Sequence, residues 1–370
     1  MRPISVLSRR GLVATVPGIA LAAAMIMPGV TAAATPHFLT SFPMQNVVAS
    51  TVPANGDINP YGIVVVPRST GNLMKGDILV SNFNAASNMQ GTGTTIVQIA
   101  PDGSRSVFAT VMASNVPSCT GGVGLTTALA VFRSGWVVVG SLPTSDGTSA
   151  TAKAGCLIVL DRWGHVSETI HGGLINGPWD MTALDRGGSG VLFVTNVLNG
   201  TVAAGGMVVD RGTVVRVDLS FMAMKPMVRS ESVIGWGFPE KSDPAALVLG
   251  PTGLALDSHW NLYVADTLDN RIAIISNAVT RMSASHMGRT VSAHHFLNQP
   301  LGLAMAPNGD VLTVNGGDGN AVEISPAGHQ VAMRLLDSVG AGTLFGLAVA
   351  PGGKGLYFVD DGSNNLQLLH

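Results

Sequence analysis

Short apolar segments recur along the chain, each followed by a turn, a second apolar segment and a polar residue. Between Gly250 and Arg271, for example, "GLAL" and "NLYVA" flank the turn "DSHW", and Asp266 closes the second segment. Short runs rich in Val, Leu and Ile that are separated by Gly, Pro, Asn or Asp are typical of strands joined by tight turns. The pattern therefore predicts antiparallel β-structure rather than helices.

The pattern returns when other segments are aligned on Gly253. Six copies are found, starting at Gly62, Ala128, Asp180, Gly253, Gly302 and Gly346. Most copies continue into one or two further strands, and four antiparallel strands repeated every 40 to 70 residues or so are typical of the blades of a β-propeller. The last copy is one strand short, so we expect the segment 37–44 to complete it. The long interval 197–249 is the place for a seventh blade, but it contains no repeat start.

The predicted fold is thus an all-β, six-bladed β-propeller of four-stranded antiparallel blades, closed by an N-terminal strand that completes the last blade. We expect one propeller domain over residues 36–370. Residues 1–34 differ in composition, because Arg9 and Arg10 precede an apolar run that ends in small residues. This order predicts a cleaved export signal of the twin-arginine type and a periplasmic or extracellular protein. An uncleaved membrane anchor is the alternative, since the run is nearly long enough to span a bilayer.

Charge and cysteine content narrow the classes of partner. The 370 residues include 20 Lys and Arg against 22 Asp and Glu, with no basic stripe, so we expect no nucleic-acid partner. After signal cleavage we expect a monomer with no stable membrane span, whose partner is a protein or a small polar ligand. Cys119 and Cys156 are the two cysteines, and both fall in one repeat. An exported pair can form a disulfide; two buried thiols are the alternative.

The stretch "PTGLALD…NLYVADTLDNRI", from Pro251 to Ile272, resembles an NHL repeat. Weaker copies are "NPYGIVV", "GPWDMTALD", "QPLGLAMAPNGDVLTV" and "FGLAVAPGGKGLYFVD". The resemblance covers nearly all of the chain after residue 36 and implies the propeller fold. It is poor in functional information, because such propellers include protein and RNA binders and an amidating lyase. Sugar lactonases share the six-bladed plan, and likeness to them implies a cation held by a Glu, two Asn and an Asp in the channel.

Two kinds of polar residue are candidates for a site at the channel mouth. A polar residue closes the second strand of every copy, at Asn82, Ser141, Asn196, Asp266, Asn315 and Asp360. Because this ring recurs in all copies, we interpret it mainly as turn architecture. Departures from the repeat carry more information, and Asp180 stands where the other copies have Gly or Ala. A carboxylate there needs solvent, a partner or a cation.

Three further residues are expected near Asp180. Trp179 is its neighbour, and Asn59 and Gln299 each precede a proline that opens a repeat. The predicted ligand-binding residues are therefore Asp180, Trp179, Asn59, Gln299, Asn196 and Asn315.

The main functional hypothesis is a binding module for a ligand or a protein, acting through the channel mouth, rather than an enzyme. The alternative is a lactonase-like hydrolase in which Asp180 and Asn196 hold Ca²⁺ or another divalent cation. None of the four Glu residues begins an inner strand, so the lactonase ligand set is incomplete.

Overall fold

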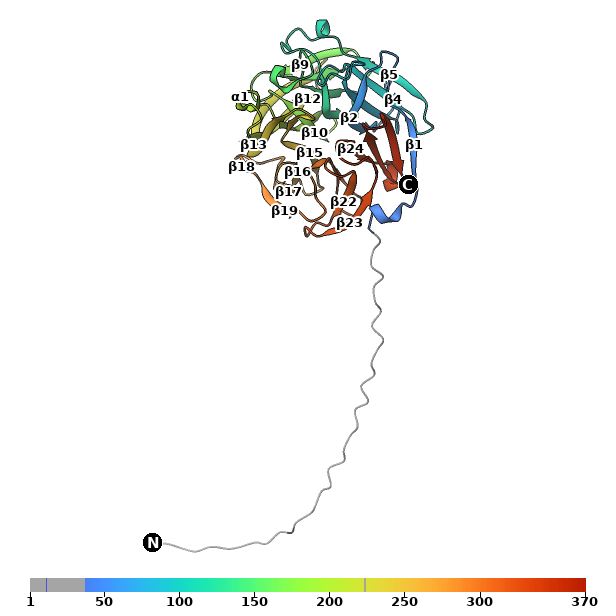
Figure 1. Cartoon of the computed structure of the whole chain (residues 1–370), viewed down its shortest axis with the longest axis vertical. Helices are drawn as coiled ribbons and strands as arrows, with labels where there is room; N and C mark the ends of the chain where they lie inside the picture. Colours follow the sequence, from blue (N-terminus) through green and yellow to red (C-terminus); the bar gives the residue numbers. More distant parts are fainter. Residues whose placement is uncertain (1–10, 12–36, 223) are drawn as a thin grey trace, which may run out of the picture. The chain divides into compact units, whose positions relative to one another are not determined.

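The computed structural model describes residue 11, residues 37–222 and residues 224–370 (Figure 1). The predicted export signal therefore lies outside the described residues, apart from Gly11. In the described residues from 37 onward the chain forms six sheets arranged around a central channel, antiparallel except for the short parallel pairing of β18 with β13. The helices in the described part are short: α1 (Thr201–Ala204) and the 3₁₀ turns η1 (Leu39–Ser41), η2 (Ala113–Asn115), η3 (Ser149–Thr151) and η4 (Pro351–Gly353). None of the helices in the described part has the length and apolar character needed to cross a membrane. The prediction of an all-β, six-bladed propeller is confirmed.

The first three blades follow the chain from the channel outward. Blade 1 contains β2 (Ile58–Val65), β3 (Ile78–Asn84), β4 (Thr95–Ile99) and β5 (Arg105–Thr110). Blade 2 contains β6 (Leu125–Val131), β7 (Val137–Ser141), β8 (Cys156–Leu160) and β9 (Val166–His171). Blade 3 contains β10 (Pro178–Asp185), β11 (Ser189–Asn196), β12 (Val209–Ser220) and β13 (Met227–Asp243), with the short strands β14 (Leu247–Leu249) and β18 (Ser285–His286) paired to β13.

The last three blades complete the ring. Blade 4 contains β15 (Pro251–Leu256), β16 (Leu262–Asp266), β17 (Arg271–Ile275) and β19 (Arg289–Ala293). Blade 5 contains β20 (Pro300–Met305), β21 (Val311–Asn315), β22 (Asn320–Ile324) and β23 (Gln330–Leu335). Blade 6 contains β24 (Leu344–Val349), β25 (Leu356–Asp360), β26 (Asn365–Leu369) and the N-terminal strand β1 (Gln45–Ser50).

An N-terminal strand does complete the last blade, because β1 pairs antiparallel with β26. The strand lies later than the segment 37–44 to which the sequence pattern assigned it. That segment instead contains η1, whose start is held by Glu323: the two carboxylate oxygens accept the N–H groups of Phe38 and Leu39 at 2.8 Å each. Both side chains are buried. The apolar residues of this segment therefore dock it against blade 5 and do not form a strand.

The interval 197–249 holds an enlarged hairpin and no extra blade among the described residues. Strands β12 and β13 are 12 and 17 residues long, whereas most strands of the other blades have five to eight. The last three residues of β13 pair with β14, so that the chain turns back at residues 244–246 before it begins blade 4. The extra length thus forms a second, small hairpin, the β13–β14 hairpin.

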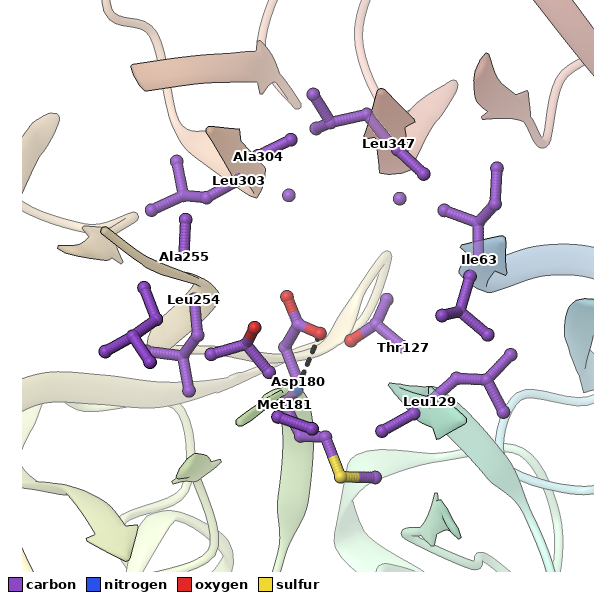
Figure 2. A pocket seen from close by; sticks show the side chains of 18 of the residues that line it. Ile63, Thr127, Leu129, Asp180, Met181, Leu254, Ala255, Leu303, Ala304 and Leu347 are labelled. Carbon is purple, nitrogen blue, oxygen red and sulfur yellow. Dashed lines mark hydrogen bonds between the residues drawn. The ribbon is translucent and has the colours of Figure 1, made fainter. Parts of the chain in front are cut away.

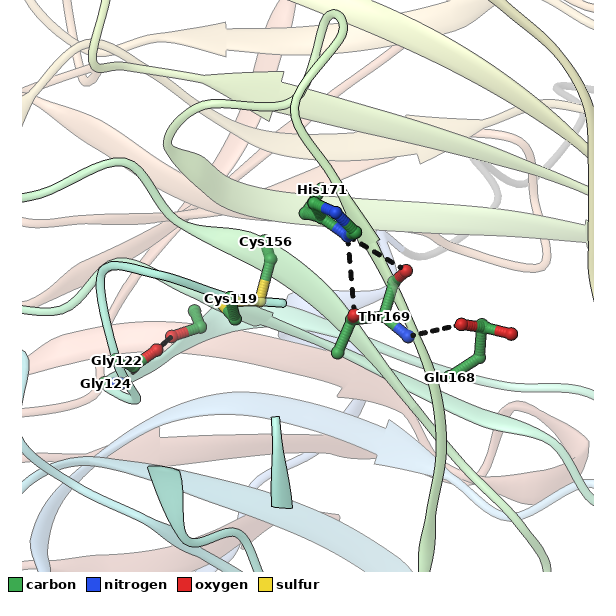
Figure 3. Close-up of a disulfide and its surroundings, with 8 residues drawn as sticks. Cys119, Gly122, Gly124, Cys156, Glu168, Thr169 and His171 are labelled. Carbon is green, nitrogen blue, oxygen red and sulfur yellow. Dashed lines mark hydrogen bonds between the residues drawn. A yellow bond between two sulfur atoms is a disulfide. The ribbon is translucent and has the colours of Figure 1, made fainter. Parts of the chain in front are cut away.

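The core lies between the blades, where neighbouring sheets pack face to face. Every residue of β3, β7, β16, β21 and β25 is buried, because these second strands are covered on both faces. This explains why they form continuous apolar runs. In blade 2 a disulfide joins Cys119, in the loop before β6, to Cys156 at the start of β8 (Figure 3). The bond ties that loop to the third strand of its own blade.

Candidate functional site

The inner strands approach one another most closely at the repeat position that holds Gly253. A Cβ atom added to Gly253 would overlap the carbonyl oxygen of Leu301 on the next blade, and one added to Gly302 would overlap the carbonyl of Phe345. In blades 4 and 5 a side chain at this position would therefore collide with the backbone of the next blade, which favours glycine there. Two cavities lie along the channel. The inner-strand residues that line the mouth cavity come before this position, and those that line the lower cavity stand at it or after it, apart from Thr127 just before it.

The mouth cavity has a volume of about 300 Å³. Three of the residues proposed from the sequence, Asn59, Trp179 and Gln299, line it together. The other residues that the argument below uses are Tyr61, Phe345, Asp361, Lys241 and Asp243. They come from the starts of inner strands, from the turn after β25, and from the β13–β14 hairpin. The loops that lead into the inner strands thus meet the ends of second strands on one face.

One wall of the mouth cavity consists of packed aromatic rings. Tyr61 lies between Phe345 and Phe83, with ring centroids 3.9 and 4.6 Å away. Trp179 meets Tyr61 and Phe83 edge to face, at 5.9 and 5.5 Å. The Thr127 hydroxyl donates to the Trp179 carbonyl and joins the inner strands of blades 2 and 3. Such a wall is rigid and apolar.

The residues before the prolines are held in left-handed backbone conformations, with φ of 63° at Asn59 and 53° at Gln299. In each case an asparagine from the preceding blade accepts the backbone N–H. Asn364 Oδ1 accepts from Asn59 at 2.7 Å, and Asn270 Oδ1 accepts from Gln299 at 2.6 Å. Asn270, at the end of the best-preserved repeat, therefore has a structural role. It positions a side chain of the next blade at the mouth.

Three polar groups gather beside the aromatic wall. Asn59 is only 6% exposed, and its Oδ1 has no hydrogen-bond partner among the described residues. Its side chain lies beside the Tyr61 hydroxyl, whose pKa is raised by burial and by the nearby Asp361. Burial, together with the charge of Asp360, raises the pKa of Asp361 to about 7. The mouth cavity is thus bordered by a buried amide oxygen without a partner, a protonated phenol and a carboxyl group that titrates near neutrality.

The β13–β14 hairpin forms the rim. Its Lys241 and Asp243 make an ion pair of 3.4 Å. Glu240 beneath is fully buried, and it accepts hydrogen bonds from the Asn199 backbone and side chain at 2.9 and 3.4 Å. Burial raises the pKa of Glu240 to about 7. From the other side, the Gln90 amide donates to two carbonyls of the hairpin turn, so the rim is tied to blades 1 and 3.

Asn196 and Asn315 are fully buried and do not line the mouth cavity. The Oδ1 atom of Asn196 accepts the N–H groups of Asn176 and Gly177 at 3.2 and 3.3 Å. Asn315 plays the same part in blade 5, where its Oδ1 accepts from Asn298 at 3.1 Å and its Nδ2 donates to a carbonyl. Their polar atoms organise the loops that lead into the inner strands.

Asp180 lines the lower cavity and not the mouth cavity (Figure 2). Its N–H donates to Thr195 Oγ1 at 3.0 Å, and its Oδ1 accepts from the N–H of Met181 at 2.7 Å. Burial raises the pKa of Asp180 to about 8. Asp180 and Asn196 do not share a cavity, so the structure does not bring together the two residues suggested as cation ligands.

The sequence reasoning missed Tyr61, Phe345 and Asp361. The first two precede the glycine of their repeats in "PYG" and "LFG", where an aromatic residue is as much a departure as Asp180 is. Asp361 follows Asp360 in "VDDG", and a doubled acid at the end of a second strand occurs in no other copy. These signals are visible in an alignment of the repeats.

The fit of a divalent cation can be tested on the oxygen donors. Ca²⁺ prefers six to eight oxygen ligands, as a rough guide. Of the described residues that line the mouth cavity, none is a Glu, and of the two Asp residues Asp243 is paired with Lys241 and Asp361 lies among aromatic and aliphatic lining residues. In the described part of the chain, one group of three ionisable ligands is close enough for a metal: His37, Asp310 and Glu323. It lies at η1, and Glu323 already accepts two N–H groups there. The lactonase ligand set is therefore not reproduced in the mouth cavity.

No protein-family model matches the chain, and no curated protein matches it. Solved structures do. A protein provisionally described as a gluconolactonase is 19% identical, with a TM-score of 0.55 over 91% of this chain and 96% of its own. A gluconolactonase from Xanthomonas campestris is 13% identical, with a TM-score of 0.51 over 88% of each chain. The calcium-binding protein regucalcin from Agrobacterium tumefaciens is 12% identical, with a TM-score of 0.52 over 86% of this chain and 92% of its own.

At these identities the likeness concerns the fold. The class is therefore a six-bladed β-propeller whose structural neighbours include gluconolactonases and regucalcin. The NHL label suggested by the repeat pattern is not supported by a family model.

Proposed function

We propose that the chain hydrolyses a small, oxygen-rich ring ester, of the lactone class, in the mouth cavity. The observation that carries the proposal is the group formed by Asp361, Tyr61 and Asn59 against the aromatic wall. A cavity of about 300 Å³ lies at the small end of ligand pockets, which range from roughly 300 to 1,000 Å³. It suits a single ring that packs against the aromatic wall and supplies the hydrogen-bond donor that the buried Oδ1 of Asn59 lacks.

Asp361 is the general base in this proposal. Its carboxylate takes a proton from a water molecule while the water oxygen forms a bond to the ester carbonyl carbon. The ring C–O bond then breaks, and the proton passes to the leaving oxygen, which gives a hydroxy acid and restores the carboxylate. A pKa of about 7 suits this task, because a general base works best when its pKa lies near the working pH. Tyr61, which stays protonated, donates a hydrogen bond to the carbonyl oxygen as negative charge develops.

The comparisons support the hydrolase hypothesis more than the binding module that the sequence first favoured, because two of the neighbours are described as gluconolactonases. The description of regucalcin as calcium-binding makes a divalent cation worth testing. Since the described residues of the mouth do not supply a calcium shell, the proposed reaction uses no step through a cation. Export from the cytoplasm is part of the proposal and is supported by the disulfide, a bond typical of oxidising compartments.

Binding without turnover is the second candidate. It is favoured by the absence of a Glu among the described residues that line the mouth cavity, since likeness to sugar lactonases implies one. The same aromatic wall and free amide oxygen would then hold a small polar ligand that leaves unchanged.

The test is hydrolysis of a panel of γ- and δ-lactones by the purified protein, with Asp361→Asn as the variant and Asp102→Asn, on an exposed turn of blade 1, as its control. We expect kcat/KM to rise with pH through about 7, because Asp361 must lose its proton to act as a base. Asp361→Asn should lower kcat by at least about 100-fold. EDTA and added Ca²⁺ should leave the rate unchanged.

The outcomes separate the two candidates. Thermal stabilisation by lactones without turnover would support binding alone, and the loss of that stabilisation in Asn59→Ala would locate it in the mouth cavity. Neither turnover nor stabilisation across the panel would overturn both candidates. A rate that depends on Ca²⁺ would contradict the cation-free reaction.

A further inference from the structure

The lower cavity is a second enclosure in the channel, distinct from the mouth cavity, with a volume of about 310 Å³. Its walls come from the second halves of the six inner strands, and Figure 2 shows their side chains arranged around an open centre. The residue after the close-approach position is apolar in every blade: Ile63, Leu129, Met181, Leu254, Leu303 and Leu347. The cavity is therefore a mainly aliphatic chamber.

Asp180 is the one charged residue among the described residues that line this chamber. No Lys, Arg or His of the described lining faces it from any of the six inner strands, so the carboxylate has no cationic partner there. Its hydrogen bonds come from backbone N–H groups, at Met181 on its own strand and Leu254 on the next blade. In Figure 2 its oxygens point toward the centre of the ring.

The other polar side chains of the described lining are neutral and add no positive charge beside Asp180. Thr127 directs its hydroxyl proton to the Trp179 carbonyl and so offers lone pairs to the chamber. Thr182 is the other lining residue with a polar side chain among those described. The chamber thus offers a carboxylate and hydroxyl oxygens within aliphatic walls. A complementary ligand carries positive charge, N–H donors and an apolar body.

We propose that the lower cavity binds a small monovalent organic cation, a protonated primary amine with a short aliphatic chain. The ammonium group pairs with Asp180, and the chain packs on the ring of Leu, Ile and Met side chains. A divalent metal ion does not fit, because a single carboxylate and aliphatic walls supply too few oxygen ligands. An anion would face an unpaired carboxylate. The proposal is independent of the reaction proposed for the mouth cavity.

The position of Asp180 in the repeat supports a ligand. Four other blades have Gly at this position and one has Ala. A buried carboxylate destabilises the fold unless it is paired, and a repeat with five neutral copies shows that the fold itself does not need one. Among the described residues that line the chamber, blade 3 alone contributes an ionisable side chain, and the other five blades contribute neutral ones.

The test is a calorimetric titration of the whole protein with hexylammonium, with hexan-1-ol and hexanoate as neutral and anionic probes of the same chain length. At pH 8.5 or so we expect hexylammonium to bind at least about tenfold more tightly than hexan-1-ol, and hexanoate not to bind. Affinity for hexylammonium should rise from pH 6 to about 8 and then level off, because the Asp180 carboxyl must ionise. The released proton should appear as a heat that depends on the buffer.

Variants assign the site and keep the test decisive. Asp180→Asn, which preserves the shape, and Asp180→Gly, which restores the residue of the other blades, should each weaken hexylammonium binding at least about tenfold. Asp361→Asn should leave it unchanged, because Asp361 lies in the mouth cavity. Equal binding of hexylammonium by folded Asp180→Asn, or equal affinity for hexan-1-ol, would overturn the proposal.

Discussion

Replacing Asp180 with Asn should stabilise the free protein, and the gain should depend on pH. The carboxyl lies in the aliphatic lower cavity, where burial raises its pKa from the ordinary 3.8 to about 8. A carboxyl whose pKa is raised in the folded state favours folding in its protonated form. Its contribution is therefore neutral below about pH 4, becomes unfavourable as the pH rises through the interval from about 4 to 8, and stays at its maximum above that.

The size of the effect follows from the two pKa values. Each pKa unit corresponds to about 1.4 kcal/mol, so the full shift corresponds to about 6 kcal/mol at pH 8 and above. The side chain is only partly buried, since the channel reaches it, and screening by water there reduces the figure. We expect Asp180→Asn to raise the free energy of unfolding by roughly 3 kcal/mol at pH 8 and by less than about 0.5 kcal/mol at pH 4.

Guanidinium unfolding of the two proteins, followed by tryptophan fluorescence at pH 4, 6 and 8, measures this difference. Other buried carboxyls, such as Glu240 and Asp361, titrate in both proteins and cancel when the two curves are subtracted. A stability difference that does not change with pH would refute the argument, as would a variant that is less stable than the parent at pH 8. Either result would mean that the Asp180 carboxylate has a favourable partner in the folded protein.

Three further predictions concern the framework. Replacing both Cys119 and Cys156 with Ser should lower the free energy of unfolding by about 2 to 4 kcal/mol, since the bond closes a loop of 37 residues; dithiothreitol should affect the parent alone. Glu323→Gln should cost about 1 to 2 kcal/mol and speed amide exchange at the start of η1, because the charged acceptor of two N–H groups is lost; unchanged exchange would contradict this. Gly253→Ala should cost about 1 to 3 kcal/mol in thermal unfolding by overlap with the next blade, whereas Ala128→Gly, at the equivalent position, should cost less than about 1 kcal/mol.

The fold could be predicted because each blade repeats the same hydrogen-bonding unit. Apolar second strands, glycine at the close approach and a polar residue at the strand end all follow from local packing, so they recur in the sequence. The N-terminal segment lies outside the repeat, and there the prediction of a strand over 37–44 was wrong. Its apolar residues Phe38 and Leu39 dock as a 3₁₀ turn on Glu323, a partner 285 residues away for Phe38, and no local pattern encodes such a contact.

The site could be predicted only in part, for a reason that lies in strand geometry. Asn59, Trp179 and Gln299 were expected at the mouth and line one cavity there. Asp180 was expected with them, but it stands at the close-approach position, where the lining of the lower cavity begins, whereas Trp179 just before it lines the mouth cavity. Sequence alignment places both residues at the start of an inner strand and does not show where along that strand the channel narrows. The doubled acid that marks Asp361 is visible in the sequence, but its raised pKa comes from burial at the junction of two blades, which the sequence does not show.

That junction links the closure of the ring to the site. Asp361 lies in the turn after β25, and Asn59 is held by Asn364 of the same turn. The carbonyl of Asn364 also accepts the N–H and the hydroxyl of Thr51, just after β1, at 2.9 Å each. The free amide oxygen and the proposed base thus lie where the N-terminal strand completes blade 6. In a ring of six equal blades no position is special, but blade 6 differs from the others because it combines strands from both ends of the chain. Loosening β1 from β26 should therefore disturb Asn59 and Asp361 before it disturbs Trp179, whose carbonyl is held by Thr127 of blade 2.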